Sequence, residues 1–334
     1  MKGQNNILSN PETITSQKWV ENRHPLVSIC CSTFNHEKYI RDAIEGFLMQ
    51  KTTFPVEILI HDDASSDGTA DIIREYEKKH PDIIKPIYQT ENQYSKGNKP
   101  GRINRKRARG KYIALCEGDD YWTDPLKLQK QVDFLEKNPE YTFVVGGFIA
   151  YNVYTGTKRE VVEAPCPGEN YDVTLEKMYT GWITKTLTAV YRKDAIDYIA
   201  LPVYKYSRDV HLFYHLAKAA KGYYLAEVLG VYHIHENGIY SVQSNINKLH
   251  THYTVYKELY KKNRDEFSRI KYFKSIFPLL KNGANEKSIV YNIQQKCKLY
   301  FEAITISRTS GDIKKILHVL LGKKMVQRIK KGNQ

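Results

Sequence analysis

The sequence has 334 residues, of which 41% are hydrophobic and 26% are charged, and its formal net charge is +14. This composition is typical of an ordinary globular protein, and the length suffices for one large hydrophobic core or two modest ones. No apolar run approaches the roughly 20 residues needed to cross a bilayer. No N-terminal stretch has the order of a signal peptide either. We therefore expect neither a membrane-spanning helix nor export.

The cysteine pattern also indicates a protein that is not exported. Five cysteines are scattered along the chain, at positions 30, 31, 116, 166 and 297. Their number is odd and their spacing matches neither a disulfide framework nor a zinc site, so they are typical of core thiols in a reducing environment. The sequence predicts a cytoplasmic protein.

The positive charge is concentrated in the last quarter of the chain. From residue 245 onward there are 20 Lys and Arg against 6 Asp and Glu, whereas the preceding residues carry 31 of each sign. Such an asymmetry indicates an anionic partner for the tail: a membrane surface, a nucleic acid or a phosphorylated substrate. A solvated helical face is the alternative.

After a polar N-terminal arm (residues 1–24), short apolar runs alternate with helical patterns. Buried strands are expected at 27–31, 56–60, 83–88 and 112–115, with helices beginning near residues 39 and 69 between them. Strands that alternate with helices predict an α/β fold with a mainly parallel central sheet flanked by helices.

The pattern continues less regularly to residue 245. We expect a helix at 125–137, strands at 141–150, 186–191 and 222–232, helices at 194–201 and 209–219, and a loop at 233–238. From residue 246 the spacing of apolar side chains is helical. The expected organisation is an N-terminal arm (1–24), a catalytic domain (25–245) and a basic helical C-terminal extension (246–334).

Three polar loops follow three of the predicted strands. They span residues 32–36, 62–67 and 117–120. Because ligands of parallel α/β sheets bind beyond the carboxyl ends of the strands, these loops should form one rim. The third loop places Glu117, Asp119 and Asp120 within four residues, a set that suits Mg²⁺ or Mn²⁺. The alternative is a solvated acidic turn that caps the next helix.

Taken together, the rim groups describe a nucleoside diphosphate ligand. An aromatic ring can stack on a base, a carboxylate can accept hydrogen bonds from a base or a ribose, and a metal ion would bridge the diphosphate. The glycine fingerprints of Rossmann and P-loop phosphate sites are both absent from these turns. This absence favours a diphosphate held by a metal.

Three motifs in order resemble those of family 2 glycosyltransferases. They are Val27-Ser28-Ile29 with Ser32-Thr33-Phe34-Asn35, then Asp62 to Thr69, and Glu117-Gly118-Asp119-Asp120, which is similar to the D-x-D region. The resemblance covers about residues 25–240 and implies the A-type glycosyltransferase fold, a nucleotide-sugar donor and a divalent metal.

The same resemblance assigns roles to residues. Donor-binding residues would be Ser32, Phe34 against the nucleobase, Asp63 bound to it, and Glu117 facing the ribose, while Asp119 would hold Mg²⁺ or Mn²⁺. Ser32 stands where many members have Pro, and Glu117 where they have Asp. The second departure could alter metal or donor geometry.

Three more candidates lie further along the chain. Arg208-Asp209 resembles the family's acidic pair near the acceptor, so Asp209 is the candidate general base, or a cap of the helix that follows it. His235 lies in a loop that resembles the segment closing over the diphosphate. Trp182 could stack on an acceptor sugar, with a core position as the alternative.

In the tail, apolar residues lie among lysines in a pattern typical of a helix on an anionic membrane, or of a helix packed on a core. The apolar residues are Ile313, Ile316, Leu317, Val319, Leu320 and Leu321. We expect peripheral binding to the inner face of the cell membrane.

The sequence thus predicts an inverting glycosyltransferase that acts on a saccharide or lipid-linked acceptor in cell-surface polysaccharide or lipopolysaccharide biosynthesis. Two alternatives remain. One is a nucleotide-sugar-binding protein without transfer activity. The other is a basic nucleic-acid-binding protein, which would leave the neutral front three quarters of the chain without a function.

Overall fold

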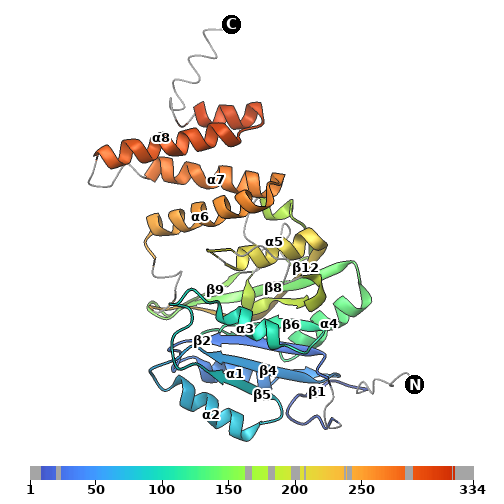
Figure 1. Cartoon of the computed structure of the whole chain (residues 1–334). Coiled ribbons are helices and arrows are strands. Elements are labelled where there is room, and N and C mark those ends of the chain that lie inside the picture. Colours follow the sequence, from blue (N-terminus) through green and yellow to red (C-terminus); the bar gives the residue numbers. More distant parts are fainter. Residues whose placement is uncertain are drawn as a thin grey trace. The chain divides into compact units, whose positions relative to one another are not determined.

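The computed structural model describes residues 9–19, 24–161, 168–179, 185–196, 204–206, 208–236, 238, 243–282, 289–317 and 319. It divides the chain into two compact units (Figure 1). Unit 1 comprises Met1–Leu201 with Asp209–His235, and unit 2 comprises Pro202–Arg208 with Glu236–Gln334.

Unit 1 combines strands, α-helices and short 3₁₀ turns. Its strands are β1 (Glu12–Thr13), β2 (Val27–Thr33), β3 (Lys51–Thr52), β4 (Val56–Asp62), β5 (Ile84–Tyr88), β6 (Tyr112–Leu115), β7 (Tyr121–Trp122), β8 (Tyr141–Asn152), β9 (Thr157–Val161), β10 (Tyr171–Val173), β11 (Val190–Arg192) and β12 (Lys221–Ile234). Its helices are α1 (Ile40–Leu48), α2 (Thr69–Lys79), α3 (Pro100–Arg107), α4 (Lys127–Lys137) and α5 (Asp209–Ala219), with 3₁₀ turns η1 (Lys177–Tyr179), η2 (Thr186–Thr188) and η3 (Lys193–Ala195).

The central sheet of the described residues has the strand order β10-β12-β8-β11-β6-β2-β4-β5, with β7 and β9 paired beside it. Strands β6, β2, β4 and β5 are parallel, and β2 matches β4 from Val27↔Val56 to Thr33↔Asp62. Almost every residue of β2 and β4 is buried, as expected for strands covered by helices on both faces. The predicted α/β fold is confirmed.

The structure departs from the predicted elements on the far side of β6. The expected strand at 186–191 is a 3₁₀ turn, η2, followed by the short strand β11, which runs antiparallel between β6 and β8. The expected loop at 233–238 begins as strand, because β12 extends to Ile234 and pairs with β7 at Gly230↔Trp122 and Val231↔Tyr121. The longer β12 carries a histidine into the functional site.

A lysine lies in the core under the acidic loop. The side chain of Lys127 is fully buried, with its ammonium 4.0 Å from the centre of the Trp122 ring and donating to Gln131 Oε1 over 2.9 Å. The Trp122 indole N–H in turn donates to the Leu187 carbonyl. Burial lowers the pKa of Lys127 to about 7, since a charged ammonium loses its hydration there.

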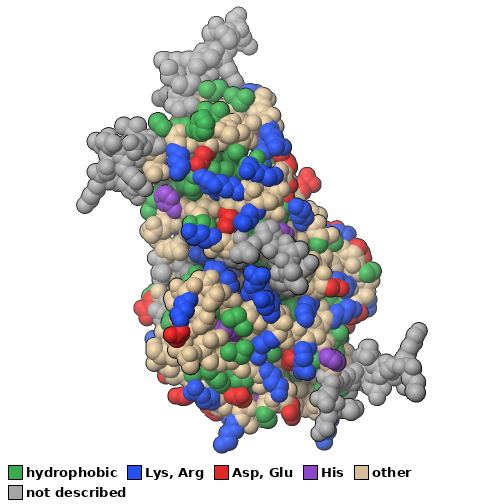
Figure 2. Space-filling view, viewed as in Figure 1, with side chains coloured by type: hydrophobic (Ala, Val, Ile, Leu, Met, Phe, Trp, Pro, Cys, Tyr) green, Lys and Arg blue, Asp and Glu red, His purple; other side chains and the backbone are tan. Residues whose placement is uncertain are grey.

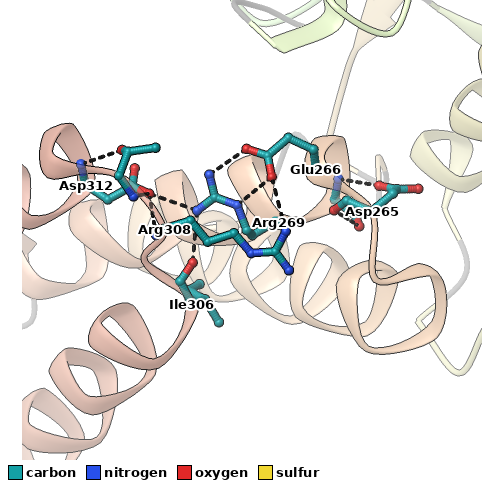
Figure 3. A network of polar contacts seen from close by, with 8 residues as sticks. Asp265, Glu266, Arg269, Ile306, Arg308 and Asp312 are labelled. Atoms are coloured by element: carbon teal, nitrogen blue, oxygen red, sulfur yellow. Dashed lines mark hydrogen bonds and ion pairs between the residues drawn. The ribbon is translucent and has the colours of Figure 1, made fainter.

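Unit 2 is helical, as predicted for the C-terminal extension. Its helices are α6 (Asn245–Asn263), α7 (Glu266–Asn282) and α8 (Ile289–Ile306), and residues 310–317 are again helical. The buried Arg269 donates to the Ile306 carbonyl, to Asp312 and to Glu266 (Figure 3). This network ties α7 to the end of α8 and to the helical residues 310–317 that follow it.

Lys127→Met should remove a pH-dependent part of the stability. Between about pH 7 and about pH 10.4 the unfolded chain binds a proton at Lys127 that the folded chain does not, so this residue makes wild-type stability rise with pH in that window. The increment is about 4 kcal/mol at most. In urea unfolding, the free energy of unfolding of the wild type relative to that of the variant should be higher at about pH 9.5 than at pH 7.

Lys137→Met on the same helix is the matched control, because Lys137 is exposed. A wild-type-minus-variant difference that stays constant across the two pH values would contradict a titrating Lys127.

Candidate functional site

The loops after β2 and β4 are joined by side-chain hydrogen bonds. Asn35 has a positive φ of 55°, which Asn tolerates better than most residues. Its backbone N–H donates to Ser65 Oγ over 2.9 Å, and its own Oδ1 accepts from the Ser66 N–H over 2.8 Å. The His36 N–H donates to Thr69 Oγ1 over 2.8 Å. These bonds hold the first two rim loops as one piece.

Gly118 brings the acidic loop against the first rim loop. Its N–H donates to the Ser32 carbonyl over 2.9 Å. A Cβ on Gly118 would lie 2.6 Å from Thr33 Oγ1 and 2.7 Å from Thr33 Cβ, closer than non-bonded atoms approach, so a glycine is required for this contact. Glu117 and Asp119 consequently lie beside residues 32–36.

Strand β12 completes the site from the other side. The His233 N–H donates to Asp120 Oδ1 over 2.9 Å, and the ring Nδ1 of His233 donates to the Asp119 carbonyl over 2.6 Å. The rings of Tyr39 and His233 lie 5.0 Å apart between centres. The backbone of the acidic loop is therefore held by a histidine of β12. His235, which directly follows the end of this strand and is buried, contacts the same loop at Asp119.

His36, Asp119 and His235 form a cluster of potential metal ligands. His235 Nε2 lies 3.0 Å from Asp119 Oδ2 and His36 Nε2 lies 3.8 Å from it, and the three ligand atoms are all within 4.8 Å of one another. One carboxylate oxygen and two imidazole nitrogens suit a divalent cation. Burial lowers the pKa of His36, which favours the neutral ring that has a lone pair to offer.

The three carboxyl groups of the acidic loop differ in charge state. For Asp119, burial opposes ionisation, but the hydrogen bond from His235 and the nearby His36 bring its pKa below the ordinary value. Burial raises the pKa of Glu117 to about 7 against the hydrogen bond from Thr186 Oγ1, and the charges of Asp119 and Asp209 add to the rise. Burial beside these neighbours raises the pKa of Asp120 well above its usual range. Asp119 is thus the one of these three residues that favours the ionised form, and it is the one that belongs to the cluster.

The other predicted donor residues have contrasting surroundings. The Phe34 ring is 42% exposed on the rim. Asp63 is only 2% exposed, and its two carboxylate oxygens accept the N–H groups of Gln93 and Tyr94 over 2.8 and 3.0 Å. Asp63 therefore braces the loop between β5 and α3, a contact the motif did not predict.

Asp209 is the first residue of α5, and its Oδ1 accepts the N–H of Val210 over 2.9 Å. Its charge contributes to the raised pKa of Glu117, which brings Asp209 into the surroundings of the acidic loop. Trp182 lies outside the described residues.

Sequence reasoning missed His36 and Thr186. His36 belongs to the same polar loop as Ser32 and Phe34, so its place at a strand end was a usable signal. Thr186, which donates to Glu117 over 2.8 Å, lies in a 3₁₀ turn where the sequence predicts a strand, and no motif marks it.

Comparison with known proteins places this arrangement in a family. The family model "Glycosyl transferase family 2" matches residues 28–199. The uncharacterized protein Rv1520 of Mycobacterium tuberculosis is 37% identical over 214 residues, 64% of this chain and 60% of the relative. The putative teichuronic acid biosynthesis glycosyltransferase TuaG of Bacillus subtilis is 30% identical over 223 residues, 66% of this chain and 83% of the relative.

Among solved structures, residues 1–349 of S. aureus TarS in complex with UDP-GlcNAc align with a TM-score of 0.62 and 20% identity, covering 84% of this chain and 81% of that one. At this identity the likeness concerns the fold, and it agrees with the A-type glycosyltransferase fold expected from the motifs. Since the family model spans more than half of the sequence, and its range contains the three rim loops, the chain belongs to glycosyl transferase family 2.

Proposed function

We propose that the chain is an inverting glycosyltransferase that moves a hexose-type sugar from a nucleotide-sugar donor to a saccharide or lipid-linked saccharide acceptor in cell-surface polysaccharide or lipopolysaccharide biosynthesis. The observation that carries the proposal is the position of Asp119 between two imidazoles, on a rim that also presents the exposed ring of Phe34. The relative TuaG, named for teichuronic acid biosynthesis, and the TarS complex with UDP-GlcNAc support this substrate class.

On the donor side, Asp119 with His235 would hold Mg²⁺ or Mn²⁺, which when bound supplies positive charge to the departing diphosphate. Phe34 would stack on the nucleobase. Asp63, which already accepts two backbone N–H groups, would reach the base with a remaining lone pair. Glu117, which already accepts a hydrogen bond from Thr186, would accept another from a ribose hydroxyl as a carboxylate, the form that a nearby cation favours. Ser32 would contribute from the same loop as Phe34.

On the acceptor side, Asp209 would take the proton from the acceptor hydroxyl as this oxygen attacks the anomeric carbon from the face opposite the diphosphate. A hydroxyl is a poor nucleophile until its proton is removed during bond formation. Attack from the opposite face inverts the anomeric configuration. Trp182 would offer an aromatic face to the acceptor sugar.

The exposed part of unit 2 supports binding to an anionic membrane surface at the cytoplasmic face. Phe301 and Ile304 of α8 are 71% and 58% exposed, and Ile313 and Leu317 in the helical residues that follow are also exposed. Figure 2 shows hydrophobic side chains at the surface of the helical part near α8, with Lys and Arg among them. No helix within the described part of the chain is long and apolar enough to cross a bilayer.

This surface differs from the apolar face predicted for the tail. Ile316 is buried and Val319 packs against the core of unit 2, while Leu320 and Leu321 lie outside the described residues. Among the described residues of the predicted face, Ile313 and Leu317 are exposed. Phe301 and Ile304 were not part of the prediction.

Asp119→Asn should abolish the metal-dependent reaction without unfolding the chain. The metal supplies several kcal/mol of charge stabilisation, so turnover should fall at least about 100-fold. A thermal-shift screen of UDP- and GDP-sugars with Mn²⁺ identifies the donor, and release of nucleoside diphosphate then measures turnover. Asp71→Asn, an exposed carboxylate of α2, is the control. Near wild-type turnover in Asp119→Asn would refute the assignment.

Asp209→Asn should leave donor binding intact and lower transfer about 100-fold or more, the range expected for a general base. Binding is measured as the donor's thermal shift with Mn²⁺, and transfer with cell-envelope extract as acceptor. Transfer at an unchanged rate would assign Asp209 to capping α5 only. Donor binding by the wild type with no transfer to any extract would favour the alternative of a nucleotide-sugar-binding protein.

Replacing both Phe301 and Ile304 by Ser should weaken membrane binding at least tenfold, because each buried CH₂ contributes about 0.8 kcal/mol. Co-sedimentation of the full chain at low salt compares phosphatidylcholine vesicles with and without phosphatidylglycerol. Tyr154→Ser removes an exposed aromatic ring from unit 1 and serves as control. The membrane proposal fails if the wild-type chain does not sediment with the anionic vesicles.

A further inference from the structure

His36 is the member of the cluster that the proposed function leaves without a role. Its backbone is fixed at both ends: its N–H donates to Thr69 Oγ1 over 2.8 Å, and its carbonyl accepts from the N–H groups of Tyr39 and Ile40 at the start of α1. The side chain is mostly buried and faces the rings of Tyr39 and His235 edge-on. The backbone therefore delivers the imidazole to Asp119 in a defined place.

Hydrogen bonding does not account for this position. The 3.0 Å contact of His235 with Asp119 has the length of an ordinary hydrogen bond, whereas the 3.8 Å separation of His36 Nε2 from the same oxygen is too long for one. The other ring nitrogen of His36, Nδ1, is buried and has no hydrogen-bond partner within the described part of the chain. Burying a polar ring in this way costs free energy that another interaction must offset.

The separations of the three ligand atoms are close to those expected for three ligands of one ion. Two atoms each about 2.1 Å from a shared cation lie about 3.0 Å apart at a right angle and about 4.2 Å apart on opposite sides. The distances from Asp119 Oδ2 are 3.0 Å to His235 and 3.8 Å to His36, and all three ligand atoms lie within 4.8 Å. Small rotations of the side chains would therefore bring the three ligands around one ion.

We propose that His36 is a third protein ligand of this cation, and that the two imidazoles make the site select Mn²⁺, Co²⁺ or Zn²⁺ over Mg²⁺. Imidazole suits transition metals, whereas Mg²⁺ takes oxygen ligands and keeps its water. The inference rests on the proposed function for the presence of a cation at Asp119. Cation binding is nevertheless measurable without sugar transfer.

The test uses the full chain stripped of metal by a chelator. Mn²⁺ binding is followed by the loss of the free-ion EPR signal, and Mg²⁺ binding by competition. The wild type should bind Mn²⁺ at least about tenfold more tightly than Mg²⁺. His36→Gln should weaken Mn²⁺ binding about 10- to 100-fold, as the loss of even an outer-shell partner does, and should change Mg²⁺ binding much less.

Two further measurements separate a ligand from a structural residue. Pulsed EPR of bound Mn²⁺ should detect nitrogen coupling from two imidazoles in the wild type and from one in His36→Gln. His36→Asp replaces the nitrogen by an oxygen ligand and should shift the preference towards Mg²⁺. His250→Gln, an exposed histidine of α6, is the matched control and should match the wild type.

Unchanged Mn²⁺ affinity in His36→Gln, or coupling from a single imidazole in the wild type, would overturn the proposal. If His36→Gln does not fold, the EPR coupling of the wild type and the metal preference of His36→Asp decide the question. Transfer by a chain whose His36 does not touch the ion refutes this inference alone. Two-imidazole binding without any turnover upholds it and refutes the proposed transferase activity instead.

Discussion

The approach of Gly118 to Thr33 is the contact on which the site depends. At this point the backbone of the acidic loop lies where a Cβ would collide with the Thr33 side chain. The N–H of Gly118 bonds the Ser32 carbonyl there. Without that approach, Asp119 would not reach His36, and the acidic loop would be a solvated turn at the end of β6. Parallel pairing of β2 with β4 and β6 brings the loops after these strands to the same edge of the sheet. Gly118 then allows the acidic loop to contact the loop after β2.

The second constraint is electrostatic. Three carboxylates within four residues would repel one another. Burial and the neighbouring charges raise the pKa of Glu117 and Asp120, whereas His235 and His36 lower that of Asp119. A bound cation would lower the pKa of all three carboxyl groups, because a nearby positive charge favours ionised carboxylates. Cation binding should therefore release protons from the loop. The raised pKa of Glu117 therefore describes the chain without a cation. With a cation bound, Glu117 would be a carboxylate and would accept a hydrogen bond from the ribose.

The sequence was sufficient to predict the parallel half of the sheet and its rim. Continuous apolar runs such as Val27–Cys31 are strong local signals, and parallel pairing places their polar ends together regardless of the rest of the fold. The contribution of β12 to the site was harder to predict from the sequence. β7 has two residues, and its pairing with Gly230 and Val231 is a contact between distant segments that no local pattern encodes. The strand character of His233 and the hydrogen bonds of Asp63 with the 93–94 backbone were missed because both depend on tertiary contacts.

For unit 2, the sequence predicted the positive charge but not which of the charged side chains face solvent. Each acidic residue that the structure describes after residue 245 accepts hydrogen bonds inside the unit: Glu258, Asp265, Glu266, Glu302 and Asp312. Basic residues such as Lys298, Lys314 and Lys315 are exposed. Because the acids are engaged internally while many bases face solvent, the outward potential of the unit is more positive than a count of residues suggests. An anionic surface met by Phe301 and Ile304 would be attracted by these bases at the same time, and either contribution alone is weaker than the two acting together.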